Sequence, residues 1–253
     1  MVSPEVFTLE LASISTPSRL DIWLTQPQTV DYPSIPDVLS ALLHTILFHR
    51  YLATVHAKDH HVLGGAIVIS TVNVPEVERV VNARIGQFME LLDASAPVSN
   101  TSTLSAHTPI RKQANLAILF YEKRSKKAWF GRVEEEEVCW EQWQLTIKTV
   151  VDATTVSGVA SGHTSPPPAS TIKTVNSTLM QILKIVGERK DHIPPILSAE
   201  GNPFPFQIVI PSTPTTPWPS VLKQWLTHPP TSDSTAGIGT SAGTHGQYDR
   251  GPP

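Results

Sequence analysis

The sequence predicts an α+β domain in which three main helices pack on an antiparallel-rich β-sheet with a protruding β-hairpin. Two apolar legs, at 116–123 and 138–152, indicate a long hairpin, because the second leg alternates apolar and polar residues over most of its length. Other segments place apolar residues three or four positions apart, which is typical of helices with one buried face. We therefore expect one domain over residues 1–211, a short C-terminal helical segment over 212–228 and a disordered tail over 229–253.

The N-terminal part predicts two strands and two helices. Residues 5–12 alternate and form the expected opening strand. Residues 34–37 resemble a capping box, and the helix after it is apolar on most of its circumference, so we expect that helix to be central and buried. A second strand is predicted at 66–72, after a Gly-Gly pair, and Pro75 opens a second helix with a clear apolar stripe.

The C-terminal part predicts a third helix, an edge strand and a short fourth helix. The third helix covers about 170–186, with a buried apolar stripe that includes Leu179, Ile182 and Leu183. Gly187 is the expected residue after its end, where glycine can adopt a positive φ. Residues 204–210 form an expected edge strand, because Pro205 cannot donate a ladder hydrogen bond. A short helix is predicted at 221–226.

Composition indicates one domain with long polar connections. The chain has 253 residues, of which 40% are hydrophobic and 16% charged, with 23 prolines. Stretches rich in Ser, Thr and Pro predict loop insertions near 13–33, 94–113 and 153–169. The formal charge of −3 argues against a nucleic-acid partner, and no apolar run is long enough for a transmembrane segment. No signal peptide is evident, so we expect a cytoplasmic location.

The predicted hairpin carries charge on both arms and two aromatic residues at its turn. The basic arm covers 123–127, the acidic arm covers 134–137, and the turn falls at 128–131. Opposite charges across paired strands stabilise a hairpin by ~0.2–1 kcal/mol per pair. Trp129 and Phe130 at the turn allow two interpretations: they fold back onto the domain as a small cluster, or they anchor a partner, as exposed aromatic residues do.

The sequence contains no arrangement of residues typical of an active site or a metal site. Gly-Thr-Ser-Ala-Gly at 239–243 matches the nucleophile elbow of α/β-hydrolases, but it lies in the low-complexity tail, without the strand and helix that hold such a turn. His44 and His49 do not have the i,i+4 spacing of a helical metal pair, so ordinary hydrogen bonds are favoured. The histidines within 59–61 are expected in a surface turn, and Cys139, the single cysteine, excludes an intrachain disulfide. We predict no enzyme activity, no cofactor and no metal.

Several segments resemble the autophagy-related protein 101 family: Leu-His-Thr-Ile-Leu-Phe-His-Arg at 43–50, Phe-Tyr-Glu-Lys-Arg at 120–124 and Cys-Trp-Glu-Gln-Trp at 139–143. Segments 179–195 and 203–208 are similar as well, in the same order and spacing. The resemblance implies a HORMA domain over 1–211, in agreement with the predicted order of helices and strands. It also implies a non-enzymatic subunit of the autophagy-initiation kinase complex.

The resemblance further implies partners and sites. Family members pair with and stabilise the HORMA domain of the autophagy-related 13 scaffold subunit, and they recruit downstream factors to the phagophore assembly site through an exposed Trp-Phe finger. Trp129 and Phe130 match that finger by position, although they are adjacent here, whereas one residue separates the two aromatics in well-known members. By analogy with the way HORMA domains dimerise, the polar face of the third helix, with Lys173, Asn176 and Lys184, is the candidate pairing face.

Two other hypotheses stay open. A HORMA adaptor of another pathway, of the spindle-checkpoint or meiotic-axis type, would have the same fold, because a fold alone does not fix a function. A hydrolase that uses Ser241 would lose its activity on deletion of the tail.

Overall fold

The computed structural model describes residues 4–11, 30–95, 110–127, 133–151, 166–196, 202–213 and 217–227. Its main sheet contains β1 (Glu5–Leu11), β2 (Val30–Asp31), β5 (Ile110–Lys127), β6 (Val133–Val151) and β7 (Phe206–Val209). The helices are α1 (Ile35–Arg50), α2 (Pro75–Ala94), α3 (Ala169–Glu188) and α4 (Trp218–Thr227), and a 3-10 turn, η1, covers Tyr32–Ser34. β3 (Ala57–Val62) and β4 (Ile67–Val72) form a separate two-stranded sheet. This combination of helices and sheets confirms the predicted α+β class.

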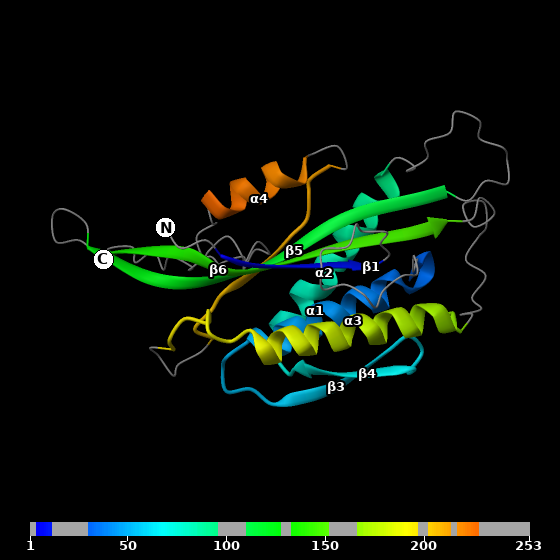
Figure 1. Ribbon diagram of the computed structural model, residues 1–253, viewed down its shortest axis with the longest axis horizontal. Coiled ribbons are helices and arrows are strands. Elements are labelled where there is room, and N and C mark those ends of the chain that lie inside the picture. The colour runs from blue at the N-terminus through cyan, green and yellow to red at the C-terminus, as the bar shows by residue number, and fades with distance from the viewer. Residues whose placement is uncertain are drawn as a thin grey trace, which may run out of the picture.

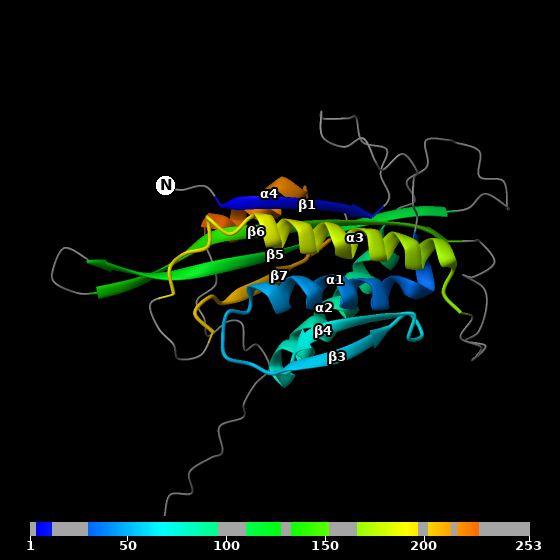
Figure 2. The same cartoon turned by 60° about the horizontal axis from the view of Figure 1, so that its bottom comes forward.

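The main sheet is built around the β5–β6 hairpin. Its strands lie in the order β1-β6-β5-β7, and β2 also pairs with β6. β5 and β6 are antiparallel and pair from Ile110–Val151 to Lys127–Val133, with one shift of register between Phe120 and Tyr121. β7 is antiparallel to β5, whereas β1 and β2 run parallel to β6. At one end the hairpin extends well beyond the other strands (Figure 1 and Figure 2).

Helices lie on both faces of this sheet. α1, α2 and α3 contribute to the main core, and α4 lies on the opposite face of the sheet, over a smaller apolar cluster (Figure 1). The β3–β4 hairpin packs on the side of α1 that faces away from the main sheet (Figure 2). Leu39, Leu42 and Ile46 of α1 are therefore fully buried, which confirms that this helix is central.

Two predicted loop insertions are shorter than expected. β5 begins at Ile110, so the end of the insertion predicted near 94–113 belongs to the sheet, where residues 110–112 pair with residues 149–151. β2 and η1 occupy residues 30–34, which the insertion near 13–33 was predicted to include in part. The polar composition of these segments predicts loops. They are nevertheless ordered, because strands far away in the sequence pair with them. The predicted tail over 229–253 and most of the insertion near 153–169 lie outside the described residues.

The capping box predicted at residues 34–37 does not form. Ser34 makes no side-chain cap to α1, and its hydroxyl donates instead to Asp31 Oδ2 at 2.7 Å. Asp37 accepts a hydrogen bond from the backbone N–H of Leu63 at 2.7 Å. Both side chains therefore connect α1 to its neighbours, and tertiary contacts replace the local cap.

The histidines within 59–61 lie in β3, so the predicted surface turn is wrong. β3 is mostly exposed and polar, and it pairs with β4 from Ala57–Val72 to Val62–Ile67. The turn follows β3, where Leu63, Gly64 and Gly65 all have a positive φ. The two glycines permit this tight reversal, because residues with a Cβ rarely adopt that conformation.

α3 runs through Gly187 and ends at Glu188, so Gly187 is not the residue that stops the helix. Its φ is not positive, and a Cβ built on it would meet nothing within 4 Å. The backbone N–H of Arg189 still donates to the carbonyl of Ile185 at 2.8 Å. The helix therefore continues past the glycine that was expected to end it. The missing side chain of Gly187 leaves open space beside the helix.

A β-bulge at Trp140 changes the faces of β6. Phe120 pairs with Glu141 and the next residue, Tyr121, pairs with Cys139, so Trp140 is the extra residue. Cys139 consequently joins the apolar cluster under α4, together with Tyr121, and not the face of Trp143 that simple alternation predicts. Trp140 and Glu141 both face the helices, because Trp140 packs in the main core and Glu141 bonds to α1.

Candidate functional site

The exposed side of α3 combines apolar and cationic side chains. Met180 and Leu183, one turn apart, are 66% and 41% exposed, although the apolar stripe of the sequence predicted Leu183 as buried. Lys173, Asn176 and Lys184 are exposed on the same helix. Their spacing places them on one side with Met180 and Leu183, opposite the buried residues Val175, Leu179, Ile182 and Val186. Sequence reasoning selected the polar members of this side and missed the two apolar ones.

Both ends of α3 are held by polar contacts. At its start, the Thr171 hydroxyl donates to Asp31 Oδ1 at 2.6 Å, which connects the helix to β2. At its end, the Arg50 guanidinium of α1 donates to the backbone carbonyl of Arg189 at 3.2 Å. The buried side of the helix packs in the main core between these two points. α3 is therefore a rigid platform for its exposed side chains.

A pocket of about 380 Å³ opens where the C-terminal ends of α1 and α3 meet. Its walls include Leu52, Leu183, Val186 and Ile193, and His49, Arg50 and Lys190 add polar atoms. Gly187 also lines the pocket, and it leaves space because it has no side chain. Leu183 belongs both to this pocket and to the exposed side of α3, so the two features are continuous.

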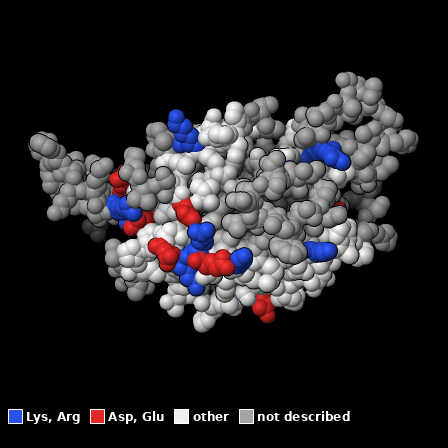
Figure 3. Space-filling model, viewed as in Figure 1, with Lys and Arg blue, Asp and Glu red and all other residues white. Residues whose placement is uncertain are grey.

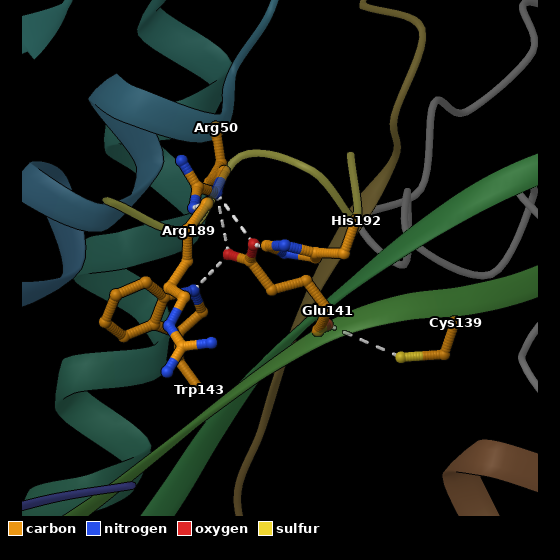
Figure 4. A network of polar contacts seen from close by, with 6 residues as sticks. All are labelled: Arg50, Cys139, Glu141, Trp143, Arg189 and His192. Carbon is orange, nitrogen blue, oxygen red and sulfur yellow. Dashed lines mark hydrogen bonds and ion pairs between the residues drawn. The ribbon is translucent and has the colours of Figure 1, made fainter. Parts of the chain in front are cut away.

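Glu141 is the centre of a buried polar network (Figure 4), and this network shares Arg50 with the lining of the pocket. Arg50 Nε donates to both carboxylate oxygens of Glu141 at 2.8 Å, and the two side chains are 2% and 0% exposed. His192 Nε2 lies 2.6 Å from Glu141 Oε2, and because a carboxylate only accepts, this nitrogen is the donor. The indole N–H of Trp143 also donates to Glu141. The network connects α1, β6 and the segment after α3.

The contacts of this network indicate a structural role and not a catalytic one. The two carboxylate oxygens of Glu141 accept hydrogen bonds from three different side chains, so they have little capacity left to bind a substrate. A partial signal of this network is present in the sequence, since Glu141 and Thr149 interrupt the apolar face of the predicted strand. Thr149 is also explained by a tertiary bond, because its hydroxyl donates to the Val30 carbonyl at 2.7 Å.

The hairpin stalk brings its basic and acidic arms together in register. Lys123, Arg124 and Lys126 of β5 pair with Glu137, Glu136 and Glu134 of β6, as the charge pattern predicts. An ion pair also forms along β5, between Arg124 and Glu122 at 2.7 Å. Acidic and basic side chains gather at the stalk and near the C-terminal end of α3 (Figure 3). Trp129 and Phe130 lie outside the described residues, between the paired strand ends Lys127 and Val133.

The remaining reactive side chains do not assemble into a site. His44 is 3% exposed, and its Nδ1 has no hydrogen-bond partner among the described residues. Burial, with a smaller effect of His60, lowers the pKa of His44 to about 4. Burial raises the pKa of the Cys139 thiol to about 12, which keeps it protonated and unreactive. Among the described residues, no three His, Cys, Asp or Glu side chains are grouped to hold a metal ion. Ser241 lies outside the described residues.

In the part of the chain that the structure describes, no helix has the length and apolar character needed to cross a membrane.

Comparison with known proteins identifies the family. The family model described as Autophagy-related protein 101 matches residues 28–200, which include α1, the β5–β6 hairpin and α3. Autophagy-related protein 101 of Arabidopsis thaliana is 30% identical over 194 residues, which cover 71% of this chain and 81% of that protein. Autophagy-related protein 101 of Schizosaccharomyces pombe is 27% identical over 200 residues, covering 78% of this chain and 90% of that protein. The chain therefore belongs to the autophagy-related protein 101 family and is an autophagy-related protein.

Proposed function

We propose that this chain is a non-enzymatic HORMA-domain adaptor that pairs with the HORMA domain of the autophagy-related 13 scaffold in the autophagy-initiation kinase complex. Family membership supports the pathway. The exposed side of α3 is the observation that carries the pairing, because Met180 and Leu183 leave apolar surface on a rigid helix. Large apolar side chains at the centre of a surface are typical of interfaces that exclude water.

The charges on this side favour a different partner over a second copy of the same chain. α3 carries Lys173 and Lys184 on its exposed side, and Lys190 follows close behind. Within the described residues, none of these lysines has a carboxylate at ion-pair distance. A symmetric dimer through α3 would bring these unpaired cations close to their own copies, which is unfavourable. A partner with carboxylates at its rim would pair with them.

Copurification of the full chain with the autophagy-related 13 HORMA domain tests this pairing. The expected result in size-exclusion chromatography with light scattering is a one-to-one complex that Met180→Asp disrupts, because a carboxylate would replace apolar contact area. Val68→Asp is the matched control, since Val68 is 52% exposed and belongs to β4 and not to α3. Two monomers that do not associate at micromolar concentration would contradict the proposal and favour a HORMA adaptor of the checkpoint or meiotic type.

The hairpin supplies the second half of the proposed function. We infer that Trp129 and Phe130 form a finger that recruits downstream autophagy factors, and that the adaptor acts in the cytoplasm at the phagophore assembly site. The register of the stalk supports this role, because the strands stay paired as far as Lys127 and Val133, and this end of the hairpin lies away from the helices (Figure 2). Exposed aromatic residues on a rigid support are typical anchors of an interface.

A double variant, Trp129→Ala with Phe130→Ala, separates the finger from the pairing face. The expected outcome is unchanged folding and unchanged pairing with the scaffold, with reduced recruitment of downstream factors to the assembly site in cells. Loss of the cooperative unfolding transition in circular dichroism would instead show that the aromatics belong to the core. Recruitment at the wild-type level would show that the finger has another role.

A further inference from the structure

The pocket between the ends of α1 and α3 is already formed in the isolated chain. Its volume of about 380 Å³ lies within the range of roughly 300–1,000 Å³ that is common for binding pockets in proteins. Leu52, Leu183, Val186 and Ile193 make most of its wall apolar. Because Gly187 has no side chain, the helix backbone forms part of the wall and the space above it stays open.

The polar groups of the pocket are fixed in place. The Arg50 guanidinium is committed to Glu141 and to the carbonyl of Arg189. Burial and the neighbouring charge of Arg50 lower the pKa of His49, so its ring is neutral near pH 7 and compatible with an apolar guest. Lys190 is exposed and has no ion-pair partner among the described residues. Among the residues that the structure describes, the pocket therefore combines an apolar interior with a lysine at its edge that has no ion-pair partner.

We propose that this pocket receives one bulky apolar side chain of the partner that docks on α3, and that a carboxylate beside that side chain in the partner's sequence pairs with Lys190. The inference rests on the proposed function and makes it more specific, since it names the anchor of the pairing surface. The partner segment that fits is a Leu, Met or Phe within a few residues of an Asp or Glu.

Three observations favour this occupant. Leu183 lines the pocket and is also 41% exposed on α3, so a partner lying on that helix reaches the pocket without a gap. The wall is mostly apolar, which suits a hydrocarbon or aromatic side chain better than a free anion. The unpaired Lys190 and Lys184 then supply charge complementarity to the residues that flank the anchor.

Gly187→Leu tests the pocket by filling it from within. A Cβ at Gly187 meets nothing within 4 Å and Gly187 lines the pocket, so the backbone accepts a side chain that takes up space at the pocket wall. Gly86→Leu is the matched control, because Gly86 is exposed on α2 and a Cβ there also meets nothing within 4 Å. We expect Gly187→Leu to raise the dissociation constant for the scaffold HORMA domain by about tenfold or more, as for a blocked anchor residue.

Lys190 is tested by a pair of substitutions in the full chain. Lys190→Glu is expected to weaken pairing by several-fold, with an effect that shrinks at high salt, whereas Lys190→Arg keeps the charge and the affinity. If the wild type pairs with the scaffold and Gly187→Leu pairs equally well, the pocket inference is overturned and the proposed function stands. If the wild type does not pair at all, the proposed function is overturned and the pocket inference falls with it. Circular dichroism melts of each variant confirm that folding is retained.

Discussion

Arg50→Met is the substitution that tests the Glu141 network most directly. Arg50 and Glu141 are 2% and 0% exposed, and Arg50 Nε donates to both oxygens of the carboxylate. Removing the guanidinium leaves a buried charge with only the His192 and Trp143 donors. Breaking a buried ion pair from one side costs about 3–5 kcal/mol. This loss is a large part of the ~5–15 kcal/mol by which a typical domain is stable.

A double-mutant cycle separates the pair from its surroundings. Glu141→Leu alone leaves Arg50 buried without its partner, so it should cost about as much as Arg50→Met. In the double variant no unpaired charge remains, and the main residual penalty is the unpaired indole N–H of Trp143, about 1–3 kcal/mol. The double variant is therefore expected to be more stable than either single variant, and the two single effects should not add.

Urea unfolding of the full chain at fixed pH, followed by circular dichroism, measures these free energies. The ion pair between Arg79 and Glu76 on α2 is the matched control, since its side chains are 45% and 58% exposed. Arg79→Met should change the free energy of unfolding by less than about 1 kcal/mol, as exposed pairs do. The reasoning is wrong if Arg50→Met costs no more than Arg79→Met, or if the two single effects at Arg50 and Glu141 sum in the double variant.

Three further predictions concern other parts of the fold. Gly187→Ala should raise the free energy of unfolding by about 1 kcal/mol, because Gly187 lies inside α3 with room for a Cβ; a lower urea midpoint would show that the residue needs glycine's backbone. Leu222→Ala, on the buried side of α4, should cost ~2–5 kcal/mol, whereas Ser220→Ala on its exposed side changes little; equal melting temperatures would exclude α4 from the cooperative fold. Because burial lowers the pKa of His44 from 6.5 to about 4, the unfolded chain binds a proton in this interval that the folded chain does not. Stability is therefore full above pH 6.5 and falls toward pH 4, and His44→Leu should flatten that slope in urea titrations.

The elements that the sequence predicted well are those with long, regular patterns. α1, α2, α3 and the β5–β6 hairpin each repeat their apolar residues over many positions, so local periodicity is enough to find them. β2 and β3 were missed because they are short or polar, and their stability comes from pairing with distant strands. Gly187 was misplaced as a helix stop because a glycine signal at a helix end is only a preference, and the contacts of α3 extend beyond it.

The sequence predicted the exposed polar residues of α3 but not its exposed apolar residues. Helical periodicity predicts that Lys173, Asn176 and Lys184 are exposed, because polar residues on an amphipathic helix face water, and their choice as the pairing face followed from the resemblance to HORMA domains. The exposure of Leu183 was not predicted, because it lies at the border of the apolar stripe, where the neighbouring elements decide whether a side chain is covered. α1 ends at Arg50, so it does not reach over Leu183, and the pocket opens there. The exposure of Leu183 therefore depends on where α1 ends, which the sequence of α3 alone cannot predict.

The bulge at Trp140 is a feature that strict alternation does not predict, and it brings a further side chain to the Glu141 network. With strict alternation, Cys139, Glu141 and Trp143 would lie on the core face of β6, and Trp140 would lie on the opposite face. The extra residue instead sends Cys139 to the α4 side and keeps Trp140 and Glu141 together on the side of α1. Trp140 then packs against His192, with ring centroids 5.6 Å apart, while Glu141 accepts the hydrogen bond of that same histidine. One inserted residue thus fixes the segment after α3 by an aromatic contact and a charged hydrogen bond, and that segment forms one wall of the proposed anchor pocket.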